Sequence, residues 1–145
     1  MLQSAQEKPV GAVASAPVAP ARRWIRIIAG IAVPWNLIGV GMFLSHVGLL
    51  GAGGTPPGGA EMPALVTVAY GIGTITGLVG SIGLAMLRRW SRMVLWVSAV
   101  ALIIDWGWVL GVSGAGNVAI GGTVLFVAGL LVVLAEMAER RSLLG

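Results

Sequence analysis

Residues 64–112 read ALVTVAYGIGTITGLVGSIGLAML (64–87), RRWSR (88–92) and MVLWVSAVALIIDWGWVLGV (93–112). Two apolar runs, each close to the ~20 residues that cross the hydrocarbon core of a bilayer, are separated by a short basic turn. Backbone amides and carbonyls in lipid must be hydrogen-bonded within their own segment, and in an open chain only a helix achieves this. A short turn also makes the two helices antiparallel neighbours. The stretch therefore predicts a transmembrane helical hairpin.

The same pattern continues on both sides of this hairpin. Further apolar runs cover residues 24–50 and 118–138, which predicts four transmembrane helices in all. Of the 145 residues, 57% are hydrophobic and 10% are charged, whereas an ordinary soluble domain carries about 25% charge. A small domain this poor in charge has too little interior to hide its apolar residues from water. We therefore expect an all-α polytopic membrane protein, an antiparallel four-helix bundle within residues 22–145.

The basic residues set the expected orientation. They lie before or at the start of the first run, between the second and the third, or after the fourth, and the two remaining connections contain none. The nine are Lys8, Arg22, Arg23, Arg26, Arg88, Arg89, Arg92, Arg140 and Arg141. Because Lys and Arg are retained on the cytoplasmic side, this distribution predicts that both termini are cytoplasmic. It also attributes the sequence pI of about 11.2 to membrane topology rather than to nucleic-acid binding.

The segments outside the apolar runs are interpreted as a tail and turns. Residues 1–21 are rich in Ala, Pro, Val and Ser, and we expect a disordered cytoplasmic tail. Residues 51–59 are rich in glycine and are expected to form a flexible loop. Ser91 is a candidate cap for the third helix and Asn117 for the fourth, because their side chains accept hydrogen bonds from the free amides of a helix N-terminus.

Asp105, in the third run, is the first candidate for chemistry. An aspartate at the centre of a transmembrane helix costs about 2.5–3.5 kcal/mol on insertion scales, so such a residue is usually paired or used. Desolvation favours its neutral, protonated form. One interpretation is a proton- or cation-coupled site. Another is a neutral acid that holds a neighbouring helix by a hydrogen bond, and a third places the residue in lipid or at the outer interface.

Asn36 lies near the centre of the first run, directly after Pro34-Trp35. Pro34 cannot donate to the carbonyl of Gly30, so we expect a kink there. The Asn36 amide then either contributes to a binding site at the kink or holds two helices together. With equal helix tilt, Asn36, Thr74 and Asp105 fall within ~5 Å of one depth. These three residues are the predicted binding site, a polar network between the first three helices.

Four glycines recur at spacings of four, three and three in the second run: Gly73, Gly77, Gly80 and Gly83. They keep one stripe of the helix bare, and small residues let helix backbones approach closely in lipid, where no hydrophobic effect drives them together. We expect this stripe to be a packing seam, either within the bundle or between copies. A solute path along the bare stripe is the alternative interpretation.

Other chemistry is limited by composition. Arg88, Arg89 and Arg92 either serve topology alone or also bind anionic lipid headgroups, at about 1 kcal/mol each. The chain has no Cys and a single His, which excludes thiolate chemistry and a His cluster that holds a metal. We find no Walker loop and no Ser–His–Asp constellation. We therefore predict no catalytic residue, no metal and no cofactor.

Two motifs in the first and second runs form a recognisable pattern. They are Trp35-Asn36-Leu37-Ile38-Gly39 and Gly80-Ser81-Ile82-Gly83-Leu84-Ala85-Met86-Leu87-Arg88-Arg89-Trp90. The pattern resembles a family of small four-helix proteins of bacterial inner membranes. This resemblance implies the fold and the location. The family has no established activity, although its members are sometimes loosely called sugar transporters.

Three functions are compatible with this sequence. The favoured one is a non-enzymatic interaction or accessory module that packs with itself or with a partner membrane protein. The alternative is a small homo-oligomeric, proton-coupled transporter in which Asp105 carries the proton and Asn36 orients the substrate. A membrane enzyme or quinone-binding subunit rests only on Asp105, His46 and the tryptophans.

Overall fold

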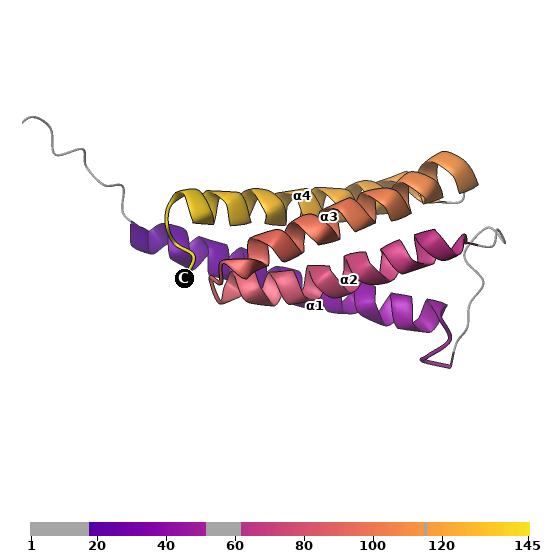
Figure 1. Ribbon diagram of the computed structural model, residues 1–145, viewed down its shortest axis with the longest axis horizontal. Helices are drawn as coiled ribbons and strands as arrows, with labels where there is room; N and C mark the ends of the chain where they lie inside the picture. Colours follow the sequence, from indigo (N-terminus) through magenta and orange to yellow (C-terminus); the bar gives the residue numbers. More distant parts are fainter. Residues whose placement is uncertain (1–17, 52–61, 115) are drawn as a thin grey trace, which may run out of the picture.

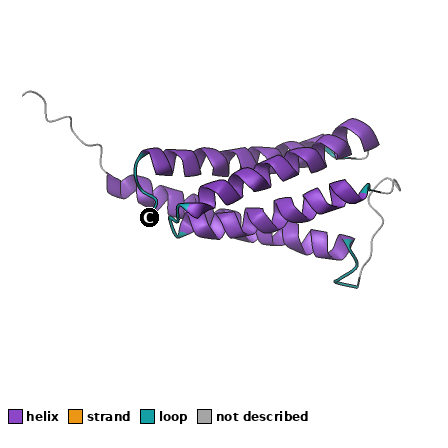
Figure 2. Ribbon diagram, in the orientation of Figure 1, coloured by secondary structure: helices purple, strands orange, loops and turns teal. Residues whose placement is uncertain are grey.

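The computed structural model describes residues 18–51, 62–114 and 116–145. The elements of this part of the chain are α1 (Val18–His46), α2 (Ala64–Ala85), α3 (Trp90–Trp108), the short π-helical segment η1 (Val109–Ser113) and α4 (Val118–Arg140). All are helical (Figure 2). Within the described ranges α1, α2, α3 with η1, and α4 are each long and apolar enough to cross a membrane. The prediction of an all-α fold is therefore confirmed, and the four apolar helices fit a multi-pass membrane protein.

The helices lie alongside one another (Figure 1), with α2 packed against both α1 and α3, and α4 packed on α3. One end of the molecule holds the start of α1, the α2–α3 turn and the end of α4. We call it the basic end, because every Lys or Arg in the described residues belongs to these three segments. The opposite, far end holds the end of α1, the start of α2 and the α3–α4 connection.

The start of α1 differs from the predicted span of 24–50. The helix begins at Val18 and has Pro20 in its first turn. Proline is tolerated there because the amide that it lacks has no intrahelical partner at that position. Residues 18–21 of the predicted tail are therefore helical, and the remainder of that tail lies outside the described residues. Through Pro34 the helix continues without a break.

The end of α1 also comes earlier than predicted, at His46. Gly48 adopts a left-handed conformation with φ of 79°. The amides of Gly48 and Leu49 donate to the carbonyls of Ser45 and Leu44 at 3.1 and 2.9 Å. This is a Schellman motif, which satisfies the last carbonyls of a helix and stops it. The apolar residues that follow belong to a turn, and residues 52–59 of the predicted loop lie outside the described ranges.

The helices α2 and α4 end in the same way, but with non-glycine residues in the left-handed position. Leu87 has φ of 56° and Ser142 has φ of 51°. The amide of Leu143 donates to the carbonyl of Ala138 at 2.9 Å, which folds residues 142–145 back over the basic end. We call these residues the strap. Its Gly145 amide donates to the Leu87 carbonyl at 2.8 Å, so the strap is tied to the α2–α3 turn.

The two predicted caps have different outcomes. Asn117 accepts hydrogen bonds from the amides of Ala119 and Ile120 at 2.9 and 3.3 Å, so it caps α4 as expected. Ser91 does not cap α3. The helix already begins at Trp90, and the Ser91 hydroxyl instead donates to the Arg88 carbonyl at 2.6 Å.

Most of the buried apolar side chains form one core toward the basic end. This core joins α1, through Ile25 and Ala29, to α4 and to the strap residues Leu143 and Leu144. Beyond Ala32, by contrast, no described side chain of α1 is fully buried. The helices α1 and α4 therefore pack together near the basic end, and a cavity separates them beyond it.

Candidate functional site: a cavity between α1 and α4

A cavity of about 170 Å³ lies between α1 and α4, with α2 and α3 behind it. Its wall is mostly apolar, and it includes two of the three residues of the predicted binding site, Asn36 and Thr74. The lining residues are Trp35, Asn36, Ile38, Gly39 and Met42 of α1, Tyr70 and Thr74 of α2, Leu102 and Trp106 of α3, and Ile120, Val124, Val127, Ala128 and Leu131 of α4.

Asn36 links α1 to α2 at the wall of this cavity. Its side-chain Nδ2 donates to the Ala32 carbonyl at 2.8 Å and to the Ser81 hydroxyl at 3.1 Å. The Ser81 hydroxyl in turn donates to the Gly77 carbonyl at 2.7 Å. Both amide hydrogens of Asn36 are therefore committed within the protein, and only its Oδ1 is left to accept.

Thr74 satisfies its hydroxyl within its own helix. The Oγ1 donates to the carbonyls of Tyr70 and Gly71, at 3.0 and 3.2 Å. Its methyl group packs toward α1, because a Cβ on Gly39 would lie 3.4 Å from Thr74 Cγ2. Thr74 thus contributes packing surface to the cavity rather than a free hydrogen-bonding group.

Asp105 is not part of this wall. It lies in α3, is only 3% exposed, and its Oδ1 has no hydrogen-bond partner among the described residues. An unsatisfied buried polar group costs about 1–3 kcal/mol. Within the described ranges no hydrogen bond joins Asp105 to Asn36 or Thr74, so the three residues do not form one bonded network.

Tyr70 is a polar residue of the cavity wall that was not among the predicted binding residues, although it belongs to the polar stripe Tyr70, Thr74, Gly77 and Ser81 of the sequence. Its ring packs edge-on against Phe43, with centroids 5.4 Å apart, and lies 6.2 Å from the ring of His46. No described group bonds its hydroxyl. The residue thus joins the cavity wall to the aromatic side chains at the end of α1. The available signal was its position one helical turn before Thr74, on the same face of α2.

The four predicted packing glycines lie buried in α2, along its contact with α3. A Cβ on Gly73 would lie 2.9 Å from Leu102, and one on Gly80 would lie 2.7 Å from Leu95. At Gly83 the neighbours are Trp90 and Ser91, at 2.6 and 2.9 Å. At Gly77 the nearest atom is Asn36 Oδ1, at 2.5 Å, followed by Ser98 Oγ at 3.0 Å. The bare stripe is therefore filled by neighbouring helices of the same chain.

Ser98 adds a polar tie across this seam. Its buried hydroxyl donates to the Gly73 carbonyl of α2 at 2.7 Å. Such a bond between helices is possible only because glycine leaves the carbonyl of α2 accessible. Together with the bond from Asn36 to Ser81, it ties α1, α2 and α3 to one another.

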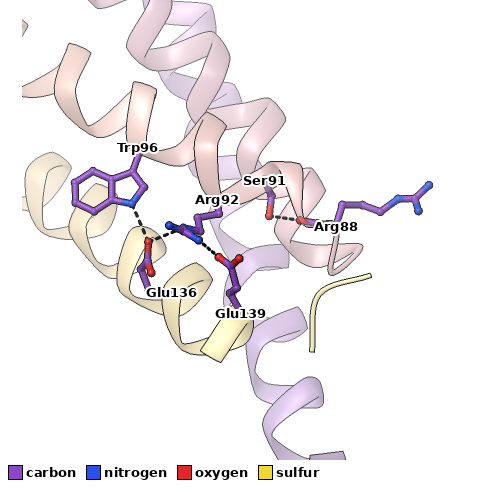
Figure 3. A network of polar contacts seen from close by, with 6 residues as sticks. All are labelled: Arg88, Ser91, Arg92, Trp96, Glu136 and Glu139. Carbon is purple, nitrogen blue, oxygen red and sulfur yellow. Dashed lines mark hydrogen bonds and ion pairs between the residues drawn. The ribbon is translucent and has the colours of Figure 1, made fainter. Parts of the chain in front are cut away.

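Arg92 forms an ion-pair contact with α4 that was not predicted from the sequence. Its guanidinium donates to Glu136 Oε1 at 2.8 Å and also to Glu139, and Trp96 Nε1 donates to the same Glu136 oxygen at 3.0 Å. Figure 3 shows Arg92 of α3 between these two carboxylates of α4. Arg92 therefore joins α3 to α4 instead of facing lipid headgroups. The side chains of Arg88 and Arg89 are exposed, so binding of anionic lipid headgroups stays a prediction for these two residues.

No protein-family model, curated protein or solved structure matches the chain. The resemblance of the two motifs therefore stays a prediction. Among the described residues, no group of three or more His, Cys, Asp or Glu side chains has the arrangement to hold a metal.

Proposed function

We propose that the chain is a non-enzymatic interaction module of a bacterial inner membrane, which packs with a second copy or with a partner membrane protein. In this proposal it forms an antiparallel bundle with both termini in the cytoplasm. The support for the orientation is the gathering of basic residues at one end, because Lys and Arg remain on the cytoplasmic side of a membrane. The support for the bacterial membrane is the resemblance of the motifs around Trp35 and Gly83.

One contrast between glycines carries this proposal. The glycines of α2 are filled by neighbouring helices, whereas a Cβ on Gly122 or Gly129 of α4 would meet nothing within 4 Å. These two lie two turns apart on one face, with the 70% exposed Phe126 between them. Gly30 and Gly41 of α1 are open in the same way. Small residues on a lipid-facing surface are where another helix approaches closely.

Native mass spectrometry after mild detergent extraction tests this function. We expect a complex heavier than the 14.8 kDa chain, either a defined homo-oligomer or one with a stoichiometric protein partner. Replacing Gly122 and Gly129 with Leu should dissociate it, because the added side chains hold the helices apart. Thr123→Leu is the matched control, because Thr123 is exposed on the same helix but lies about 100° around it from Gly122. A wild-type monomer without a partner would contradict the proposal.

Asp105 favours a second candidate function, a homo-oligomeric proton-coupled transporter. A buried carboxyl whose Oδ1 has no partner among the described residues has a free position for an exchanging proton. Asn36 suits the part of substrate ligand less well, because both its amide hydrogens are engaged.

Vesicles that contain the protein and a trapped pH indicator test this candidate. With a mixture of candidate solutes outside the vesicles, an imposed potential should drive proton entry with the solute, and Asp105→Asn should abolish it while Thr123→Ala, on the exposed side of α4, leaves it unchanged. Equal proton entry in wild type and Asp105→Asn would end this candidate.

A further inference from the structure

We propose that the cavity between α1 and α4 holds one acyl chain of a membrane lipid, which enters from the leaflet at the far end. The inference goes beyond the interaction module and does not depend on its partner. It rests on the shape of the cavity, the state of the polar groups in its wall and its position along the helices.

The shape of the cavity suits a chain rather than a compact solute. The lining extends from Ile120 to Leu131 on α4 and from Trp35 to Met42 on α1. At 1.5 Å per residue these stretches are roughly 16 and 10 Å long. A volume of about 170 Å³ distributed over that length is narrow. An apolar cavity of about 150 Å³ elsewhere holds benzene, so this volume accommodates a hydrocarbon segment of similar size.

The chemistry of the wall favours hydrocarbon over a sugar. The amide hydrogens of Asn36 and the hydroxyl hydrogen of Thr74 are already donated to groups of the protein. A sugar brings several hydroxyl groups, and each one left without a partner costs about 1–3 kcal/mol. A methylene chain requires no partner. The internal bonds that hold α1 to α2 therefore leave no free donor on Asn36 or Thr74, and the free groups of Tyr70 and Trp106 lie toward the far end, where the polar part of the lipid approaches.

The position of the cavity indicates which leaflet supplies the lipid. Ile120 lies within the first turn of α4 and Met42 within about one turn of the end of α1, both at the far end. Near the basic end the cavity is closed, because the core there joins α1 to α4. Tyr70 and Trp106, whose polar groups have no described hydrogen bond, are the lining residues of α2 and α3 nearest the far end. They stand on the side from which the polar part of the lipid approaches.

A photoreactive lipid tests the proposal. The protein is reconstituted in vesicles of phosphatidylethanolamine with a trace of phosphatidylglycerol that carries a diazirine midway along one acyl chain. After illumination, adducts are mapped by peptide mass spectrometry. We expect adducts on Leu102 and Leu131, which are only 6% and 3% exposed and reach lipid only through the cavity. Leu84 and Leu95 are equally buried outside the cavity lining and should stay unlabelled.

Two variants of α4 separate cavity binding from general contact with lipid. Val124→Trp fills the cavity and should reduce the adducts on Leu102 and Leu131 to the level of Leu84. Phe126→Trp adds the same ring to the outward face and should leave them unchanged. If Val124→Trp does not fold, Val124→Phe replaces it. The difference in adducts between Leu131 and Leu84 in the wild-type protein tests the proposal in either case. Labelling confined to exposed side chains, equal labelling in both variants, or suppression by excess glucose would overturn the proposal.

Discussion

The interface between α2 and α3 and the interface between α1 and α4 join helices of similar length and hydropathy, yet they pack differently. The first is lined by glycines and crossed by the bond from Ser98 to Gly73. The second is closed only near the basic end and contains a cavity beyond it. In lipid, apolar side chains gain little by leaving hydrocarbon for another helix, so small residues and polar ties decide how closely two helices approach. The comparison of the two interfaces teaches that large apolar side chains alone do not bring two helices into close contact in a membrane.

Substituting a seam glycine should have the largest effect. Gly80→Leu forces a side chain against Leu95, with its Cβ 2.7 Å from Leu95 Cδ2 and 3.4 Å from the Leu95 amide nitrogen. Overpacking costs about 1–3 kcal/mol and occasionally more, and the backbone contact puts this site at the upper end, ~3 kcal/mol. Unfolding in mixed micelles with increasing SDS, followed by circular dichroism, measures the free energy of unfolding.

Gly129→Leu is the matched control for this substitution, because a Cβ there meets nothing within 4 Å. Gly129→Leu gains the same helix propensity as Gly80→Leu. It should change the free energy of unfolding of the monomer by about 0.5 kcal/mol or less. Equal losses in the two variants would remove the distinction between a packed seam and an open face.

Removal of the tie between α1 and α2 should have an intermediate effect. Asn36→Ala deletes the bond to Ser81 and should lower the free energy of unfolding by about 0.6–2 kcal/mol, the range for hydrogen bonds between membrane helices. Thr123→Ala is the control, because its hydroxyl bonds only to the Ala119 carbonyl of its own helix. A loss at Asn36 no greater than at Thr123 would mean that packing alone holds α1.

Replacement of the unpartnered acid should have a small effect of opposite sign. Asp105→Leu removes a buried polar group whose Oδ1 lacks a partner among the described residues, so the variant should be neutral or more stable by about 1 kcal/mol. The same SDS titration measures it, with Ser98→Ala as a control that should lose stability. Destabilisation by Asp105→Leu comparable to that of Gly80→Leu would show that Asp105 has a partner.

The tie between α3 and α4 should give the smallest effect. The groups around Arg92 are about one-third exposed, and such ion pairs are weak and screened by salt. Arg92→Gln should lower the SDS midpoint slightly at low NaCl, and the difference from wild type should shrink at high NaCl. The matched variant Arg88→Gln removes an exposed charge of the same turn that has no ion pair in the described residues. An effect of Arg92→Gln that did not respond to salt would point to packing instead.

The helices could be predicted because hydrocarbon thickness and backbone hydrogen bonding leave few other solutions. The bounds of α1 could not be taken from the apolar run, because lipid does not determine where a helix ends. Gly48 does, by adopting a left-handed conformation. A glycine two residues after His46 was the feature of the sequence that could have predicted this earlier end of α1.

The depth of the candidate site in the membrane could be predicted from the sequence, but the direction in which each side chain points could not. Counting residues placed Asn36, Thr74 and Asp105 at one level, and the first two do line one cavity. Depth does not specify which way a side chain points around its helix axis. Asp105 follows Leu102 by three residues, on the face of α3 that packs against α2. The cavity itself depends on how α1 and α4, which are distant in the sequence, separate, and no local pattern records that.

The strap has a consequence for the order of assembly during synthesis. The α2–α3 turn is local, so this pair can associate as soon as α3 has entered the membrane. Leu87 then holds a left-handed conformation, which costs about 1–2 kcal/mol for a residue with a side chain, without the bond from Gly145. Gly145 follows α4 in the chain and arrives only after the whole bundle has been inserted. The strap can therefore close over the basic end only after α4 has been made.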